Sequence, residues 1–333
     1  MIPRRAVSAG RIVGPLLVAC TAFGALVAPL VAPHQTADRF PNLLNAPPTV
    51  VRVLDQSGRV RAPFIHPWRR VSQLEQIYEI DHSRRVPLIW FSGGRLVQSA
   101  DDAHAPLLLL GADGFGRDVF ARLLFAARTS LSLSLVAALG AVCLGALLGG
   151  AAGYMGGATD DILMRASDFV LVLPVMYVVL ALRAVMPLVL APGSVFLLLA
   201  AIFTVVGTPS IARGVRGIVR SERHLDYAVA AMSLGAGHGR LLVSHLLPAA
   251  RGFIVVQVTL LVPAFIVAEA TLSYVGLGFT EPLVSWGAML QDASNLRALV
   301  DFPWLLSPAA AMFGVVMGLN LALQKYRGAG LAQ

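Results

Sequence analysis

Long apolar runs separated by polar segments dominate the chain and predict its architecture. An apolar helix of about 20 residues crosses a bilayer, with a usual range of roughly 17–25. Runs within or near this range occupy residues 12–32, 130–154, 169–190, 195–211, 252–274 and 304–323. The pattern therefore predicts an all-α polytopic membrane protein with six transmembrane helices.

The composition supports a membrane protein and argues against a nucleic-acid partner. The chain has 333 residues, of which 57% are hydrophobic and 13% charged, whereas soluble domains have about 25% charged residues. The net charge of +8 comes almost wholly from arginine. These arginines flank apolar runs and are not grouped with aromatic residues on one face, so membrane orientation explains them better than nucleic-acid binding. The two cysteines lie in apolar runs and indicate neither a disulfide framework nor a metal site.

Charges next to the short loops predict the orientation. The basic N-terminus (residues 1–11), the arginines between residues 213 and 223, and the basic C-terminus are expected on the cytoplasmic side. A cleaved signal peptide is the alternative for the first run. It is disfavoured because this run is longer than the roughly 7–15 residues of a signal core.

Residues 33–110 form a polar segment without a spanning run and are predicted to be a small extracytoplasmic insert with some β structure. Residues 49–54 and 87–91 have strand character, and residues 55–58 resemble a turn. The arginines of the insert do not contradict the orientation, because loops beyond about 60 residues translocate largely regardless of charge. The predicted organisation is thus residues 1–32 (cytoplasmic N-terminus and first span), 33–110 (insert), 111–325 (five further spans) and 326–333 (cytoplasmic tail).

The most informative polar segment is residues 221–248, between the fourth and fifth spans. Helical spacing predicts a short helix with one face formed by Tyr227, Ala230, Ala231 and Leu234. Gly235 is expected to end it. A second helical piece over residues 240–247 is expected to stop at Pro248, which has no backbone N–H. A helix, a turn and a second helix suit a part that another protein grips.

This segment resembles the cytoplasmic loop of binding-protein-dependent ABC importer permeases, whose motif is E-A-A, three residues, G, nine residues, I-x-L-P. The matching positions are Ala230, Ala231, Gly235, Leu247 and Pro248. Two positions depart from the motif: Val229 replaces the glutamate and His245 the isoleucine. Asp226 is an acid one turn earlier. The resemblance implies that residues 221–248, called the coupling segment below, dock on an ATPase subunit.

Residues 110–131 are similar to the pattern L-G-T-D-x-x-G-R-D-V-x-S-R-L-x-x-G-x-R-x-S-L of one branch of those permeases. That branch imports dipeptides, oligopeptides and, in some members, nickel. We expect an amphipathic helix along the outer membrane interface. Its motif residues include Asp113, Gly116, Arg117 and Asp118. Residues 269–289 also resemble a family motif, E-A-x-L-S-F-L-G-L-G followed by P-x-x-S-W-G-x-M.

Two ionisable residues in predicted spans are candidates for the translocation pathway. Arg183 either faces the pathway or extends to the interface, and Glu269 is either a site for a peptide amine or proton or a buried structural acceptor. A second feature is a stripe of small residues spaced four apart, from Ala141 through Gly145, Gly149 and Gly153 to Gly157. Such a stripe favours close helix packing, within this subunit or against a partner subunit.

The resemblance implies the permease subunit of an ATP-driven importer in a bacterial inner membrane, with peptides as the expected solute. The sequence has no G-x-x-x-x-G-K-[ST] phosphate loop. This chain is therefore expected not to be an enzyme and to bind no cofactor or metal. ATP and Mg would be bound by two partner ATPase subunits. A second homologous permease and an extracytoplasmic solute-binding protein complete the expected assembly.

Three alternatives remain. The first is an ABC permease for nickel or another small solute. The second is a self-contained secondary transporter, which would need coupling-ion sites and often internal repeats. The third is a membrane-embedded enzyme, which would need a nucleophile with a base or a metal motif.

Overall fold

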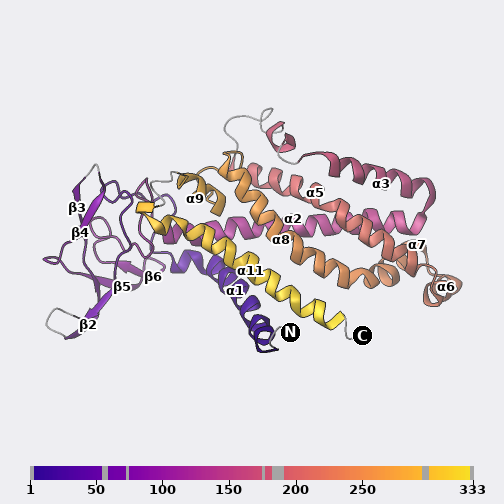
Figure 1. The fold of residues 1–333 in the computed structure, drawn as a ribbon, viewed down its shortest axis with the longest axis horizontal. Helices are drawn as coiled ribbons and strands as arrows, with labels where there is room; N and C mark the ends of the chain where they lie inside the picture. Colours follow the sequence, from indigo (N-terminus) through magenta and orange to yellow (C-terminus); the bar gives the residue numbers. More distant parts are fainter. Residues whose placement is uncertain are drawn as a thin grey trace. The chain divides into compact units, whose positions relative to one another are not determined.

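The computed structural model describes residues 4–54, 59–72, 75–174, 177–181, 191–294 and 300–330. The helices are α1 (Arg4–Val31), α2 (Val119–Met155), α3 (Gly157–Val172), α5 (Pro192–Glu222), α6 (Asp226–Ser233), α7 (His238–Leu241), α8 (Arg251–Tyr274), α9 (Trp286–Asp292) and α11 (Ser307–Gly330). Three short turns join them: a π-helical turn η1 (Leu242–Leu246) and the 3₁₀ turns η2 (Leu247–Ala250) and η3 (Pro303–Leu306). Figure 1 shows this mostly helical chain.

Helices long and apolar enough to cross a membrane confirm the predicted class of polytopic membrane protein. Within the described residues they are Val13–Val31, Val119–Met155, Pro192–Glu222, His238–Tyr274 and Pro303–Leu323. The remaining predicted span, 169–190, lies partly outside the described residues, which omit 175–176 and 182–190. A count of six spans therefore stays a prediction.

The fourth span differs from its prediction at its C-terminal end. The apolar run predicted it to end at residue 211, with the arginines between residues 213 and 223 next to the short loop that follows. Instead α5 continues as a helix through Pro209 to Glu222, so Arg213 and Arg216 lie on its last turns. The Thr208 hydroxyl donates to the Thr204 carbonyl at 2.7 Å in the turn before the proline. Side-chain bonds of this kind help a helix to tolerate an internal proline.

The chain divides into two compact units, and the boundaries fall inside α1, α2, α8 and α11. Unit 1 comprises residues 1–15, 131–269 and 316–333, and unit 2 comprises residues 16–130 and 270–315.

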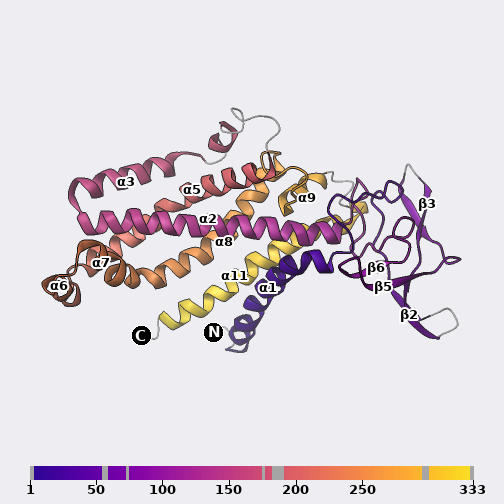
Figure 2. The ribbon, with the colours of Figure 1, turned by 180° about the vertical axis from the view of Figure 1, so that it is seen from behind.

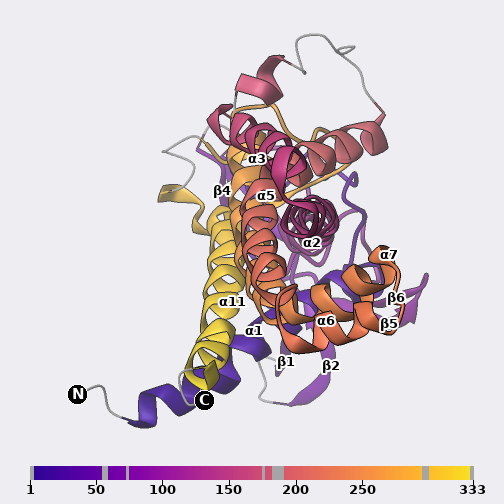
Figure 3. The same ribbon diagram turned by 90° about the vertical axis from the view of Figure 1, so that its right-hand side faces the viewer.

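In unit 1, α2 and α5 pack closely along the predicted stripe of small residues. A Cβ added at Gly149 would lie 2.2 Å from the Ala212 carbonyl oxygen, and one at Gly145 would lie 2.6 Å from the Ile211 Cβ. Gly153 meets α5 in the same way, with the Arg216 carbonyl oxygen at 2.6 Å. The stripe from Gly145 to Gly153 therefore serves packing within this subunit, whereas Gly157 begins α3 and a Cβ there would meet no atom within 4 Å. Figure 3, a view close to the axis of α2, shows α3 and α5 beside it.

In unit 2, six strands lie between α1 and α2. They are β1 (Arg52–Leu54), β2 (Val60–Ile65), β3 (Trp68–Ser72), β4 (Ile77–Ile80), β5 (Val86–Ser92) and β6 (Arg95–Ser99). An antiparallel four-stranded sheet has the order β1-β2-β5-β6, and β3 pairs with β4 in a second sheet. The strands predicted at 49–54 and 87–91 correspond to β1 and β5. The turn predicted at 55–58 lies outside the described residues.

Two small apolar clusters support these strands. One contains Ile65, Val86, Ala105 and Leu107, all buried. The other contains Leu43, Ala46, Leu108 and Ala112, with Trp68 and Tyr78 packed against it. The buried strand residues of the first cluster, Ile65 and Val86, lie at the ends of β2 and β5, whereas Val60, Trp90 and Phe91 are exposed.

Candidate functional site

The coupling segment contains the predicted short helix, α6, and its predicted end. Gly235 has φ +87°. Its N–H donates to the Met232 carbonyl at 2.9 Å, and the Ala236 N–H donates to the Ala231 carbonyl at 3.0 Å. These two bonds form a Schellman motif, which needs a left-handed residue at the Gly235 position. Gly235 therefore fixes the direction in which the chain leaves α6.

The predicted stop at Pro248 is wrong. The chain continues from α7 through η1 and η2 into α8 as one helical stretch, His238–Tyr274. Pro248 lies in the first turn of η2, where the winding changes from π to 3₁₀. A missing N–H is tolerated at such a first turn, so the proline alters the winding without ending the helix.

Two side-chain contacts fasten the coupling segment to the end of α2. The Arg223 Nη1 atom donates to the carbonyls of Gly153 and Tyr154, at 3.3 and 2.7 Å. These carbonyls belong to the last turn of α2, where a cation is favoured by the free carbonyls and the helix dipole. The Tyr154 hydroxyl also bonds to the His238 Nδ1 atom. Arg223, which precedes α6, and His238, which follows it, are thus both bonded to the end of α2.

Exposed apolar side chains characterise α6. Ala228 is fully buried and Ala231 partly, in a cluster with residues of α5, α7 and η1. Leu225, Val229, Met232 and Leu234 are exposed, Leu234 by 89%. The predicted face of Tyr227, Ala230, Ala231 and Leu234 is therefore not the buried face. A helix of this length packs along one edge only and leaves the rest of its apolar surface uncovered. Figures 1 and 2 show α6 and α7 at one end of α5.

Ion pairs connect α3 to α5 next to this segment. Both oxygens of Asp160 accept hydrogen bonds from the Arg216 guanidinium, one of them at 2.5 Å. Asp160 is buried, and Arg220 lies 3.6 Å from it. Arg213 and Asp168 form a second pair at 2.7 Å between exposed side chains. The first pair fixes the start of α3 on α5.

The residues predicted to form an interfacial helix, Asp113, Gly116, Arg117 and Asp118, lie in a turn before α2. The helix begins only at Val119 and is continuous with the predicted second span. Asp113 organises the turn, because its Oδ1 accepts from the backbone N–H groups of Phe115 and Arg117 at 2.9 and 3.0 Å. Short polar side chains that bond their own backbone compete with helix formation.

Gly116 and Asp118 complete the turn. Gly116 has φ +74°, and a Cβ there would lie 2.3 Å from the Phe40 carbonyl oxygen, so only glycine fits. Asp118 precedes α2, and its Oδ1 accepts from the N–H groups of Phe120 and Ala121 at 2.8 and 3.3 Å. It is the N-cap of α2. The motif thus builds the N-terminus of a long helix.

An arginine–carboxylate cluster surrounds this turn; it consists of Arg117, Arg122, Asp113, Glu281 and Asp292. Arg117 donates to Asp113 at 2.7 Å and to Asp292 at 2.6 Å, and it also bonds to Glu281. Arg122 contacts Asp292 at 3.1 Å and Glu281 at 3.2 Å. Burial lowers the pKa of Arg117, but the three carboxylates outweigh it and raise the pKa above its usual value.

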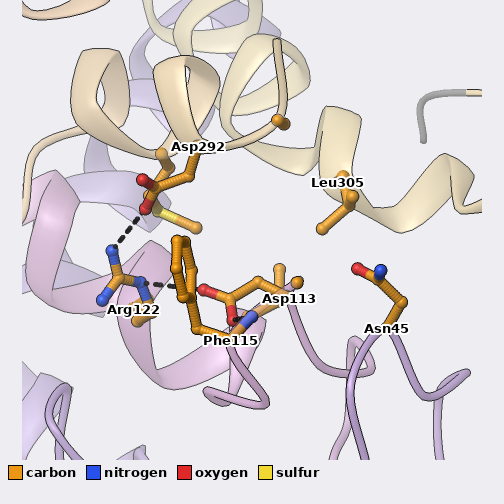
Figure 4. A pocket seen from close by; sticks show the side chains of 10 residues that line it. Asn45, Asp113, Phe115, Arg122, Asp292 and Leu305 are labelled. Carbon is orange, nitrogen blue, oxygen red and sulfur yellow. Dashed lines mark hydrogen bonds and ion pairs between the residues drawn. The ribbon is translucent and has the colours of Figure 1, made fainter. Parts of the chain in front are cut away.

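A cavity of about 220 Å³ borders this cluster and is lined by Asn45, Asp113, Phe115, Arg122, Asp292 and Leu305, among others. Figure 4 shows Arg122 between the carboxylates of Asp113 and Asp292, with Asn45 and Leu305 across the cavity. The two arginines of the cluster are 3% and 4% exposed and are surrounded by acids. The cluster therefore holds residues 281–292 against the start of α2.

His34 connects the end of α1 to the same turn. Its Nδ1 lies 2.7 Å from Asp118 Oδ2, and its Nε2 lies 3.0 Å from Asp102 Oδ1. Burial lowers the pKa of His34, but the bonds to Asp102 and Asp118 outweigh it and raise the pKa to about 9. A protonated imidazole thus donates to two carboxylates at neutral pH.

Three partners of this turn were not predicted from the sequence: Glu281, Asp292 and His34. Each lies 84 or more residues from its partner along the chain. Helical or strand periodicity predicts contacts between nearby residues only, so it does not predict pairs this far apart in the sequence.

Of the two candidate pathway residues, the structure describes only Glu269. Glu269 lies in α8 and is fully buried. Arg183 lies outside the described residues. Their roles stay predictions.

Comparison with known proteins identifies a family over most of the chain. The family described as "Binding-protein-dependent transport system inner membrane component" matches residues 105–326. The match includes the coupling segment and the turn at residues 111–118 and leaves out β1 to β6.

Individual relatives are similar over the same extent. The oligopeptide transport system permease protein OppC of Bacillus subtilis (strain 168) is 39% identical over 212 residues, which is 63% of this chain and 67% of OppC. The dipeptide transport system permease protein DppC of the same strain is 42% identical over 58% of each chain. The glutathione transport system permease protein GsiD of Pectobacterium atrosepticum is 34% identical over 70% of this chain and 73% of GsiD.

Proposed function

The chain belongs to the family of binding-protein-dependent transport system inner membrane components, and from this membership we propose that it is the permease subunit of an ATP-driven peptide importer. In this role it forms one half of a translocation pathway across a bacterial inner membrane. The observation that carries the proposal is the coupling segment, because its apolar side chains remain exposed on a helix that is tied firmly to α2.

Peptides are the proposed solute because three similar permeases are named for oligopeptide, dipeptide and glutathione transport. Nickel or another small solute is the second candidate. In such an assembly the external binding protein largely determines which solute is imported. The uptake assay below therefore includes both solute classes.

The proposed assembly contains a second homologous permease, two ATPase subunits that bind ATP and Mg, and an extracytoplasmic solute-binding protein. Leu225, Met232 and Leu234 would be covered by an ATPase subunit. Burial of apolar surface stabilises such an interface by about 25 cal/mol per Å² before the costs of association. The N- and C-termini and α6 would then be cytoplasmic, and β1 to β6 extracytoplasmic.

The proposed mechanism depends on the rigid connection between the coupling segment and α2. When ATP brings the two ATPase subunits together, α6 moves with its ATPase. Because Arg223 and His238 fasten this region to α2, the movement reaches the spans as a rigid-body rotation. The helices then alternate between inward-open and outward-open states of different affinity.

Cysteine labelling tests the proposed sides of the membrane. With Cys20 and Cys143 replaced by alanine, a single cysteine is introduced at Met232, 42% exposed, or at Val60, 80% exposed. A membrane-impermeant maleimide added to intact spheroplasts should label Val60→Cys and leave Met232→Cys unlabelled until the membrane is broken. Labelling of Met232→Cys in intact spheroplasts would contradict the orientation.

Crosslinking and uptake test the assembly. Met232→Cys should crosslink to an ATPase subunit, and Val60→Cys should not. Reconstituted assembly should take up peptide with ATP and binding protein present. Uptake of nickel alone would support the second candidate, and uptake by this chain without an ATPase would contradict the proposal.

A further inference from the structure

A further cavity, of about 590 Å³, lies in unit 2, and Arg39 in its lining pairs with Glu281 of the arginine–carboxylate cluster. It is formed by the loop of residues 39–43, by β3, and by the turn at residues 103–104. These residues precede the range matched by the family, 105–326. The volume is within the roughly 300–1,000 Å³ of small-molecule sites.

The lining of this cavity is basic on one part and apolar on the rest. Arg39, Arg69, Arg70 and His104 contribute the polar part, and Phe40 and Trp68 are the aromatic residues. Among the residues that line it there is no aspartate or glutamate. An anion with an apolar or aromatic part matches this combination.

The cations of the cavity are only partly neutralised. Arg39 pairs with Glu281 at 3.0 Å, but both side chains are about half exposed. Arg69 lies 3.7 Å from Glu79 with both side chains largely exposed, and such pairs contribute little. Arg70 lies next to the Tyr78 hydroxyl, where it opposes the rise in the pKa of Tyr78 that burial causes. The Arg70 guanidinium thus lies beside the neutral hydroxyl of Tyr78.

Trp68 provides an independent observation. In the part of the chain that the structure describes, its Nε1 atom is buried and has no hydrogen-bond partner. A buried donor without a partner costs free energy, so such groups call for an explanation. Trp68 lines the cavity, but solvent does not reach its Nε1 atom. A small rotation of the indole ring would bring this donor to a bound oxygen acceptor, while the guanidinium groups would neutralise the charge.

We propose that this cavity binds a small organic carboxylate that has an apolar or aromatic part. The carboxylate would accept hydrogen bonds from Arg70 and, once the indole ring has rotated, from Trp68, and the apolar part would lie against Phe40. Two sources have this chemistry: the C-terminus of a short peptide and a free aromatic acid. The site needs only this chain, so it does not depend on the transport function proposed above.

Binding to the purified full-length chain in detergent, measured by calorimetry, tests the proposal. The probes are two matched pairs: indole-3-acetate with indole-3-acetamide, and the dipeptide Gly-Phe with its C-terminal amide. We expect saturable binding of at least one carboxylate and at least tenfold weaker binding of its amide. If only the dipeptide binds, the ligands of the cavity are peptide C-termini. If indole-3-acetate binds, the ligands include free aromatic acids.

Variants distinguish this cavity from general attraction to a basic surface. Arg70→Gln, which removes the positive charge, and Trp68→Phe, which removes the indole N–H, should each weaken carboxylate binding about tenfold. Arg59→Gln is the matched control, since Arg59 is exposed and does not line the cavity. All variants should keep the thermal midpoint of the wild type, and Arg69→Gln replaces Arg70→Gln if the latter does not fold.

Three results would overturn the proposal: no saturable binding of either carboxylate, equal binding of carboxylates and amides, or equal weakening by Arg59→Gln and Arg70→Gln. Peptide uptake by the assembly is measured separately. Loss of carboxylate binding in Arg70→Gln with normal uptake would support the site and show that transport does not need it.

Discussion

His34 should make the stability of the protein depend on pH between about 6 and 10. Its two partners, Asp102 and Asp118, raise its pKa from 6.5 to about 9 in the folded state. Each unit of difference corresponds to 1.36 kcal/mol, so the protonated imidazole stabilises the fold by about 3 kcal/mol. Because the folded pKa is the higher one, this stabilisation is fully present below about pH 6.5. It is lost as the pH rises through about 9.

The assay is thermal unfolding of the purified chain at pH 6 to 10, for the wild type, His34→Gln and His104→Gln. His104 is the control, because it also contacts an aspartate but is 73% exposed. We expect the wild type and His104→Gln to lose stability in parallel as the pH rises. His34→Gln should start lower at pH 6 and change little. A His34→Gln profile parallel to that of the wild type would refute the reasoning.

Two further predictions concern the contacts of α5. Gly149→Ala should lower the thermal midpoint, because its Cβ would lie 2.2 Å from a backbone oxygen and overpacking costs about 1–3 kcal/mol. Gly217→Ala, with no atom within 4 Å, should leave it unchanged or raise it, and equal behaviour of the two variants would contradict the packing. Arg216→Gln should destabilise by about 1–3 kcal/mol, because it leaves the buried Asp160 without its main partner. Arg213→Gln breaks an exposed pair and should cost under about 1 kcal/mol, so an equal or larger loss there would contradict the assignment.

The sequence predicted those features that depend on local pattern. Apolar runs are sufficient to locate spans, since the bilayer sets their length. Gly235 was predicted correctly because a left-handed helix end is a local requirement. Pro248 was predicted wrongly, because its effect depends on whether the chain rewinds into a π or 3₁₀ turn. That outcome is decided by packing of the whole segment.

The candidate site was predicted only in part. The motif at residues 111–118 was recognised, but its conformation was not. Asp113 and Asp118 were assigned to an interfacial helix, yet they bond to backbone N–H groups and form a turn and a cap. Their long-range partners, such as Asp292 and His34, come from distant parts of the chain. Pairing across such separations is a property of the tertiary fold and has no periodic signal.

The proposed coupling role is tested most directly by binding-protein-stimulated ATP hydrolysis of the reconstituted assembly. The variants are Gly235→Val and Gly237→Val. Gly235 has φ +87° and Gly237 has φ −65°, so a β-branched residue is strained only at the first position. We expect Gly235→Val to assemble but to lose most of the stimulation and the peptide uptake, and Gly237→Val to keep both. If both variants hydrolyse ATP and take up peptide as the wild type does, α6 is only a connector and the coupling role is wrong.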